Sequence, residues 1–286
     1  MTDADSIASR RKAVCFLILT AILWSSSGLC IKMIHWGPLA ILGGRSLVAA
    51  VVFLVYLRRP EFSWSGVQVA GAIAYTSSQL FFILGTKLTV AANVVFLTFT
   101  SPIYIILFGY WFLNERPYRA DWAAMAAIFT GMFLFFGDDF SLDGMRGNLC
   151  GVLSGVALAA MIICLRRQKM GVPANTILLG NFLGAIIGLP FLLQESFTIS
   201  SVGTILFLGI FQIGISFILY SIAIKHVHAL ESNLIVTLEP VLNPIWVFLV
   251  LGEIPGKLAF MGGILVLGAV IARAIVSSHT VPEETV

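Results

Sequence analysis

The feature that most restricts the fold is a series of long stretches without Asp, Glu, Lys or Arg. The hydrocarbon core of a bilayer is about 30 Å thick and takes about 20 apolar residues per helix. Six uncharged stretches approach or exceed that length: residues 13–31, 62–86, 88–114, 147–165, 171–194 and 196–224. Only 11% of the 286 residues are charged, whereas soluble domains carry about 25%. We therefore expect an integral membrane protein.

Four further stretches bring the expected number of transmembrane helices to ten. They are shorter or contain an internal charge: residues 38–57, 122–137, 228–251 and 258–272. The continuous apolar runs favour helices over a β-barrel, whose strands alternate between apolar and polar residues. The predicted fold is all-α. The basic run Arg10, Arg11 and Lys12 also fits a signal peptide, but residues 13–31 are longer than its apolar region of about 7 to 15 residues. We expect this segment to be retained as the first helix.

The distribution of Lys and Arg predicts the orientation of the chain. With the N-terminus inside, the inner side holds 12 of the 17 basic residues: Arg10, Arg11, Lys12, Arg58, Arg59, Arg116, Arg119, Arg166, Arg167, Lys169, Lys225 and Arg273. The outer side holds four, namely Lys32, Lys87, Arg146 and Lys257. The positive-inside rule then places both termini in the cytoplasm, and we expect a bacterial inner (plasma) membrane. A net charge of +3, scattered between apolar blocks, gives no reason to expect nucleic-acid binding.

The sequence lacks the common motifs of metal sites, cofactor sites and enzyme active sites. The expected outer loop carries Asp138, Asp139 and Asp143 without EF-hand spacing, so a solvated acidic loop is favoured over a Ca²⁺ site. The four cysteines stand singly, and packing is favoured over a disulfide between Cys30 and Cys150. The sequence contains no His-Glu-x-x-His, Gly-x-Ser-x-Gly or P-loop motif. We expect no metal, no cofactor and no enzyme activity.

The sequence contains an internal repeat. A shift of 138 residues aligns seven pairs: Gly71 with Gly209, Ser78 with Ser216, Lys87 with Lys225, Ala91 with Ala229, Pro102 with Pro240, Glu115 with Glu253, and Pro117 with Pro255. Earlier in each half, a shift of 135 aligns Cys15 with Cys150 and Pro38 with Pro173. Each half has five expected helices, an odd number, so the second copy must enter the membrane from the opposite side. The sequence therefore predicts two inverted five-helix repeats.

The repeat divides the chain into five expected parts. They are a cytoplasmic N-terminus (1–12), a first repeat (13–137), an outer loop (138–146), a second repeat (147–276) and a cytoplasmic tail (277–286). Inverted repeats give a carrier two nearly equivalent states, with a site near the midplane. A scaffold that is merely stable is the alternative. Pro102, Pro240 and Pro244 fall within the fourth and ninth expected helices and are candidates for gating breaks, with packing kinks as the alternative.

Two Glu-x-Pro turns carry a resemblance to a known family. They are Asn114-Glu115-Arg116-Pro117 and Gly252-Glu253-Ile254-Pro255, each ahead of the last helix of its half. With the ten expected helices, Gly44-Arg45-Ser46 and Leu238-Glu239-Pro240-Val241, the chain resembles the EamA type of the drug/metabolite transporter superfamily. Asn114 in place of Gly252 is a small departure. The resemblance implies an alternating-access exporter of amino acids, other metabolites or drugs, with a cavity between the halves, and leaves the substrate open.

Polar and aromatic side chains share one face in four of the expected helices, because residues three or four apart are neighbours on a helix. The candidate substrate-binding residues are Trp24 and Ser27, then Tyr75, Ser78 and Gln79, then Gln212, Ser216 and Tyr220, and finally Asn243 and Trp246. For each of them, hydrogen bonding between helices is the alternative. Asn181 is expected to serve packing, because Gly180, Gly184 and Gly188 form a ridge of small residues beside it.

Arg45 and Glu239 are the charges expected within helices. A charge at a helix centre costs about 2.5 to 3.5 kcal/mol on insertion scales, so each needs a partner or a watery cavity. We expect that the two neutralise each other. Glu239, directly before Pro240, is also a candidate site for proton coupling, with a fixed ion pair or a neutral hydrogen-bonded carboxyl group as the alternative.

These features predict a transporter that exports small polar or amphipathic metabolites. Amide and aromatic groups with few charges suit an amphipathic or zwitterionic ligand better than a polyanion. Amino acids are the first candidates, multidrug or organic-cation export is the alternative, and a channel is less favoured. The expected partners are a small-molecule substrate, membrane lipid and, if Glu239 is a coupling site, protons.

Overall fold

The computed structural model describes residues 3–89, 91–115, 117–136, 144–242 and 257–279. Their elements are helices, and these residues contain no β-strand. The helices are α1 (Asp3–Trp24), α2 (Ser27–Met33), α3 (Pro38–Leu57), α4 (Gly66–Leu88), α5 (Ala91–Thr98), α6 (Ser101–Leu113), α7 (Arg119–Phe136), α8 (Met145–Arg167), α9 (Pro173–Leu192), α10 (Ile199–Phe207), the π-helix η1 (Leu208–Ile215), α11 (Ser216–Ala223), α12 (Ala229–Val236) and α14 (Lys257–His279). The all-α prediction is confirmed for the residues described.

Within the residues described, seven helical segments are long and apolar enough to cross a membrane. They are Ile7–Met33, Pro38–Leu57, Gly66–Leu88, Asn93–Leu113, Met145–Arg167, Pro173–Leu192 and Ile199–Ala223. Where the tenth helix was predicted, α14 contributes the shorter apolar segment Phe260–Arg273. The predicted ninth helix extends into residues 243–256, which lie outside the described residues. A multi-pass helical protein is therefore confirmed, whereas the count of ten helices stays a prediction.

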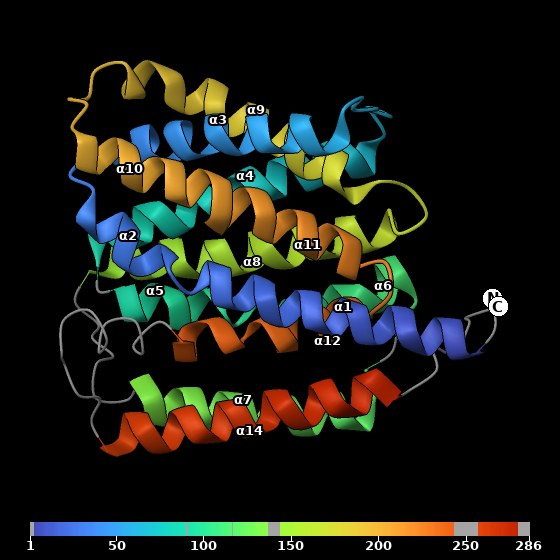
Figure 1. The fold of residues 1–286 in the computed structure, drawn as a ribbon. Helices are drawn as coiled ribbons and strands as arrows, with labels where there is room; N and C mark the ends of the chain where they lie inside the picture. The colour runs from blue at the N-terminus through green and yellow to red at the C-terminus, as the bar shows by residue number, and fades with distance from the viewer. Residues whose placement is uncertain (1–2, 90, 116, 137–143, 243–256, 280–286) are drawn as a thin grey trace.

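Corresponding helices of the two halves run antiparallel, as an inverted repeat requires. In α3 and α9, Gly43 lies against Gly188 while Ser46 lies against Gly184, so the residue numbers run in opposite directions. A Cβ atom on Gly188 would meet the Gly43 Cα at 2.3 Å, so the two backbones touch at a place where only glycine fits. In α7 and α14, which lie side by side in Figure 1, the start of one helix is joined to the end of the other.

The remaining contacts also pack helices of one half on helices of the other half. The third expected helix, α4, packs on α8 and α9, and its counterpart, the segment formed by η1 and α11, packs on α1 and α3. Local sequence supports the helix ends: Pro38 and Pro173 occupy the first turns of α3 and α9, where a missing N–H costs nothing. Asn114 ends α6 with a φ of 57°, a left-handed conformation that asparagine tolerates.

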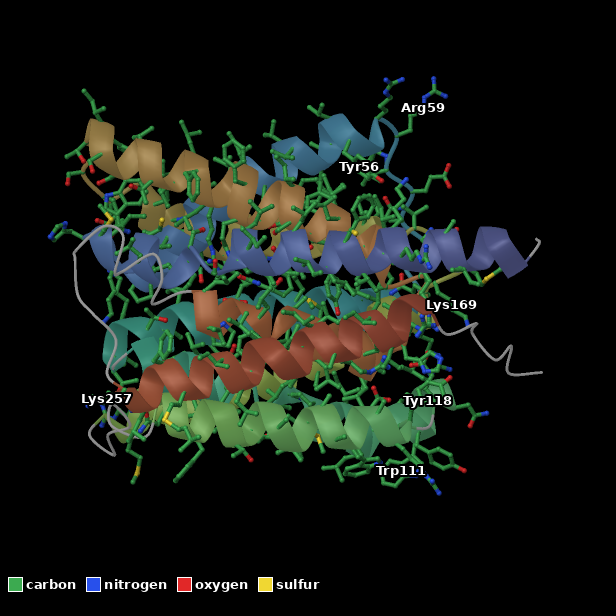
Figure 2. The ribbon with its side chains drawn as sticks, turned by 60° about the horizontal axis from the view of Figure 1, so that its bottom comes forward. Tyr56, Arg59, Trp111, Tyr118, Lys169 and Lys257 are labelled. Atoms are coloured by element: carbon green, nitrogen blue, oxygen red, sulfur yellow. The ribbon has the colours of Figure 1, made fainter. Side chains whose placement is uncertain are left out.

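The two ends of the bundle are polar and its sides are apolar. Figure 2 places Arg59 and Lys169 at the end where α1 begins and α14 ends, which we call the terminal end, and Lys257 at the opposite end. Tyr56 and Trp111 are exposed near the terminal end, where aromatic rings of membrane proteins commonly meet the interface. This distribution agrees with helices that cross a bilayer along the long axis of the bundle.

Candidate functional site

A cavity between the two repeats encloses about 430 Å³ of empty space, including its open part. The first half contributes Trp24, Ser27, Ser78, Gln79, Phe82, Thr98 and Phe99, and the second half contributes Ser154, Leu158, Gln212, Phe217 and Glu239. Most of these residues lie near the middle of their helical segments. Both halves of the chain therefore form the wall of one mid-bundle pocket.

Interrupted helices place several of these side chains at the cavity. α1 ends at Trp24 and α2 begins at Ser27, and α5 and α6 are separated by Phe99 and Thr100. In the second half, α12 ends at Val236, and residues 238–242 form a separate helical stretch that carries Glu239. Breaks of this kind are tolerated in membranes only where protein or a cavity satisfies the freed backbone groups.

The breaks lie close to two of the three predicted prolines. Pro102 is within the first turn of α6, and Pro240 follows the turn at Thr237. The turns themselves are equivalent, because Phe99 and Thr237 are 138 residues apart, which is the shift of the repeat. Pro244, predicted as a further break, lies outside the described residues, as do the predicted site residues Asn243 and Trp246. Whether the breaks open and close during transport stays a prediction.

Aromatic stacking forms one wall of the cavity. The Trp24 ring lies 4.7 Å from that of Phe217 and 5.6 Å from that of Tyr220, measured between centroids. Its Nε1 donates a hydrogen bond to Ser216 Oγ at 2.8 Å. Tyr75 meets Phe217 edge to face at 5.0 Å. Trp24 is therefore held in one orientation, with its ring packed on the second repeat.

Three of the predicted substrate contacts stand behind this wall. Tyr75, Ser216 and Tyr220 are buried and are not among the residues that line the cavity. The Tyr75 hydroxyl donates to Asn181 Oδ1 at 3.0 Å, and the Tyr220 and Ser232 hydroxyls share a hydrogen bond of 3.0 Å. Their polar atoms join helices, which was the alternative interpretation of each. The expectation that Asn181 serves packing agrees with this contact.

Hydroxyl groups join the helices around the cavity at Ser78 and at its repeat partner Ser216. Ser78 Oγ donates to the Ser154 carbonyl at 3.3 Å, and Ser154 Oγ donates back to the Ser78 carbonyl at 3.1 Å. Ser216, the repeat partner of Ser78, accepts at its carbonyl from Thr20 Oγ1 at 3.1 Å. Ser78 and Ser154 line the cavity while their hydroxyls are used by the opposite helix. These two serines therefore help to fix the position of the cavity wall.

Arg45 and Glu239 do not form the ion pair that we expected. Arg45 has no exposed surface, and its Nη2 donates to Gln79 Oε1 at 2.5 Å. Glu239 is 6% exposed and lines the cavity. Among the described residues, no basic side chain lies within ion-pair distance of Glu239. The guanidinium group is held by the adjacent helix α4 instead, and the carboxyl group faces the cavity unpaired.

The sequence interpretation missed part of the wall. Phe217 is the repeat partner of Gln79, so the 138-residue shift was a signal that it faces the same space. Thr98 and Phe99 line the cavity because the helix is interrupted beside them, just ahead of Pro102. The π-helix η1, which carries Gln212, gave no signal in the apolar pattern. Such segments are frequent at functional sites.

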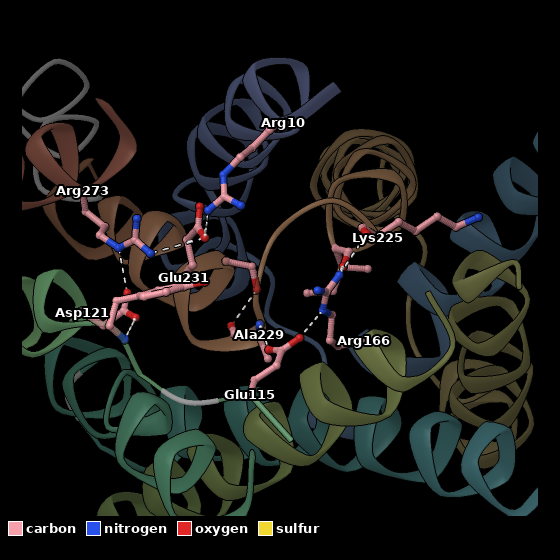
Figure 3. A network of polar contacts seen from close by, with 11 residues as sticks. Arg10, Glu115, Asp121, Arg166, Lys225, Ala229, Glu231 and Arg273 are labelled. Carbon is pink, nitrogen blue, oxygen red and sulfur yellow. Dashed lines mark hydrogen bonds and ion pairs between the residues drawn. The ribbon is translucent and has the colours of Figure 1, made fainter. Parts of the chain in front are cut away.

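A buried charge cluster at the terminal end was also missed. Arg10 Nη2 lies 2.6 Å from Glu231 Oε2, and Arg273 contacts both Asp121 Oδ1 at 2.7 Å and Glu231 Oε2 at 3.3 Å. Figure 3 shows the cluster tying together α1, α7, α12 and α14, two helices from each repeat. All four side chains are at least 98% buried. The cluster holds both repeats together at this end of the bundle.

A second ion pair lies beside this cluster. Arg166 Nε lies 2.6 Å from Glu115 Oε1, and the other Glu115 oxygen accepts from the Ala229 N–H at 2.9 Å. Arg166 also donates to the carbonyls of Ile224 and Lys225 at the end of the eighth expected helix. The glutamate of the first Glu-x-Pro turn thus caps α12 (Figure 3). Glu253, its partner in the repeat, lies outside the described residues.

Known proteins resemble this chain along nearly its whole length. An "Uncharacterized transporter" of Clostridium kluyveri is 20% identical, over 85% of this chain and 86% of that one. The "Uncharacterized transporter YdfC" of Bacillus subtilis is 24% identical, over 91% of each chain. A solved structure titled "Crystal structure of protein" shares the fold with a TM-score of 0.78 at 20% identity, over 94% of this chain and 100% of that one.

The family comparison finds the repeat directly. The family described as "EamA-like transporter family" matches twice, at residues 11–137 and at residues 145–273. The two matches together cover most of the chain, and each spans one of the two antiparallel halves. The chain belongs to the EamA-like transporter family and is a multi-pass membrane transporter.

Proposed function

We propose that the protein exports small amphipathic metabolites that carry an amino group, with amino acids as the first candidates, by alternating access. The observation that supports this most is the composition of the cavity wall. It combines the carboxyl group of Glu239, which has no ion-pair partner among the described residues, with the amides of Gln79 and Gln212 and with four aromatic rings, including that of Trp24. A carboxylate suits an amino group, the rings suit an apolar side chain, and the amides suit the remaining polar atoms.

Alternating access is supported by the position of the cavity between inverted repeats. The charge cluster of Arg10, Asp121, Glu231 and Arg273 joins helices of both repeats at the terminal end, so opening that end must separate buried ion pairs. We place this end in the cytoplasm of a bacterial inner membrane, following the positive-inside rule. In that orientation the structure is closed to the cytoplasm, and export begins when the cluster opens.

Orientation can be tested without a substrate. Lys169 and Lys257 are exposed at opposite ends of the bundle (Figure 2). Single cysteines at these positions, in a background lacking Cys15, Cys30, Cys150 and Cys164, should react with an impermeant maleimide from the cytoplasmic side at 169 and from the outer side at 257. Labelling of both from one side would refute the proposed topology.

Transport should be measured with the purified protein in liposomes. We expect saturable uptake of leucine and counterflow, in which an outward leucine gradient drives entry of labelled leucine. A channel would conduct leucine without counterflow. Uptake of 3-methylbutylamine, which lacks the carboxylate of leucine, without uptake of leucine would favour organic-cation export. Glu239 and the aromatic wall are the observations that keep that second candidate open.

A further inference from the structure

Arg45 is a buried cation whose hydrogen-bonding capacity is largely unused. It has no exposed surface, and its Nη2 donates to the Gln79 side chain at 2.5 Å and to the Gln79 carbonyl at 3.4 Å. Its Nε and Nη1 have no hydrogen-bond partner among the described residues. No acidic side chain in this part of the structure lies within ion-pair distance of it. A charge retained in a membrane without a counter-ion points to a function.

The position of Arg45 is fixed by tight packing. η1 crosses α3 so closely that a Cβ atom on Gly209 would meet the Val48 Cβ at 2.4 Å and the Arg45 carbonyl at 3.0 Å. Two residues before Arg45, Gly43 touches Gly188 of α9. Helix α3 therefore has little freedom to shift at this point. The guanidinium group stays where it meets α4.

The contact determines which way the Gln79 amide points. Guanidinium nitrogens are donors only, whereas a glutamine side chain has one acceptor oxygen and two N–H donors. The oxygen must therefore face Arg45, and this settles an orientation that is otherwise assigned rather than observed. Gln79 also lines the cavity, so the N–H donors are the part of the amide left to face it. A cation on the carbonyl side strengthens these donors.

Several other polar groups of the wall are already used by the protein itself. The Trp24 N–H already donates a hydrogen bond to Ser216, and the hydroxyls of Ser78 and Ser154 donate to carbonyl groups. Glu239, Gln212 and Ser27 also line the cavity; Gln212 Oε1 is buried without a partner among the described residues, and the Gln212 amide and the Ser27 hydroxyl are further donors of the wall. Gln79 is thus the donor of the wall whose amide is held and polarised by a buried cation, and Glu239 is its acidic group.

We infer that Arg45 is a positioning residue that holds Gln79 as the receptor for a carboxylate oxygen of the substrate. This inference rests on the proposed function and deepens it, because it assigns the group that separates amino acids from simple organic amines. Arg45 does not touch the ligand itself. It orients and polarises the amide, and its positive charge favours an anionic oxygen on the far side.

Three matched probes test the inference: leucine, 3-methylbutylamine, which lacks its carboxylate, and 4-methylpentanoate, which lacks its amino group. The first measurement is binding to the purified wild-type protein, followed as the rise in melting temperature with probe concentration. The two carboxylates should stabilise the protein. Loss of one charge-assisted hydrogen bond should weaken their binding about tenfold to a hundredfold in Gln79→Leu. Binding of the amine should change less than about twofold.

The Arg45 variants separate positioning from a merely structural role. Arg45→Gln should raise the Kd of both carboxylates about tenfold and leave that of the amine unchanged, and Arg45→Lys should restore part of the affinity because it restores the charge. In liposomes, Arg45→Gln should raise the KM for leucine with little change in kcat. Ser46→Ala, next to Arg45 on α3, is the matched control and should behave as wild type.

The outcomes distinguish the inference from the proposed function. Equal weakening of all three probes in the Arg45 and Gln79 variants overturns the inference, and so does a wild-type protein that gains no stability from either carboxylate. Carboxylate binding that depends on Arg45, without any leucine transport, supports the inference and rejects amino-acid export.

Discussion

Two groups of buried charge in this protein differ in how they are neutralised. At the terminal end, Arg10, Asp121, Glu231 and Arg273 lie within 2.6 to 3.3 Å of opposite charges. In the middle of the bundle, Arg45 has only the Gln79 amide and backbone as described partners, and Glu239 faces a cavity. A neutralised group needs no ligand to be stable in a membrane, whereas an unneutralised group is costly unless something else uses it. The terminal cluster therefore fits a structural closure, and the mid-bundle charges fit a binding site.

Neither group of buried charges is present in both halves of the repeat. The repeat partners of Asp121, Glu231 and Arg273, at a shift of 138, are Ala259, Asn93 and Phe135. At the opposite end, the contacts of charged side chains with backbone groups include Lys87 to the Ile34 carbonyl and Glu195 to the Gly37 N–H. The two ends of a nearly symmetric molecule are thus closed by different chemistry. We expect them to differ in the energy needed to open them.

The largest expected effect comes from removing one charge of the terminal cluster. Arg273→Met leaves Asp121 and Glu231 with reduced compensation, and breaking a buried pair from one side costs about 3 to 5 kcal/mol. Thermal unfolding in detergent should show this loss directly. Lys257→Met, at the exposed start of the same helix α14, is the control and should change stability little. A similar loss in both variants would remove the special role of the cluster.

The next effect separates the two groups by function. Glu239→Gln loses no ion pair, so we expect a stability change below about 1 kcal/mol, the range of a single hydrogen bond. Glu231→Gln should destabilise the protein far more. If Glu239 binds the coupling proton, Glu239→Gln should abolish uptake driven by a pH gradient yet preserve exchange at equal substrate concentrations. Loss or retention of both activities would reject proton coupling and leave a structural carboxyl group.

The fold was largely predictable because its signals are local or repetitive. Uncharged stretches of spanning length identified the membrane helices, and the 138-residue shift identified the antiparallel halves. Proline identified the two interrupted regions but not the turns themselves, which fall three residues earlier, at Phe99 and Thr237. The break at Ser25 and Ser26 has no such marker. At this break the hydroxyls of Ser25 and Ser26 donate to the carbonyls of Ile22 and Leu23, three residues earlier, and Trp24 packs on the other repeat.

The site was predictable only in part. The helical period shows which residues share one face of a helix, but not which helix or cavity that face meets. Trp24, Gln79 and Gln212 line the cavity, whereas the faces carrying Tyr75 and Ser216 meet other helices. The terminal cluster joins residues as far apart as 221 positions in the chain, so no local pattern indicates its pairs. The predicted roles of Asn243 and Trp246 stay predictions, because these residues lie outside the described structure.

A smaller effect tests the contribution of the aromatic cavity wall, as distinct from that of the buried charges. Trp24→Phe keeps the aromatic stacking on Phe217 but removes the hydrogen bond from Nε1 to Ser216, worth about 1 kcal/mol. We expect a several-fold rise in the KM for substrate and a slight fall in melting temperature. Trp24→Ala should reduce transport much further while the protein still inserts in the membrane. Normal uptake by both variants would exclude Trp24 from the site.

The smallest expected effect is a pH dependence at the terminal end. Partial burial of His226 lowers its pKa, and the nearby cations Lys225, Arg166 and Lys12 lower the pKa further. The folded protein therefore binds this proton less readily than the unfolded chain, whose histidines have a pKa of about 6.5. Stability contributed in this way is present above that value and is lost as the pH falls through it.

His226→Gln should consequently reduce the loss of melting temperature between about pH 7.5 and pH 5.5, by a small amount because His226 is partly exposed to solvent. Removing the histidine also removes a proton acceptor beside three basic groups, so the difference from wild type should grow as the pH falls. His35→Gln, in the turn between α2 and α3 at the opposite end, is the matched variant. An unchanged pH profile in His226→Gln would show that titration at the terminal end does not act through this residue, and would leave its ion pairs as the contribution of that end to stability.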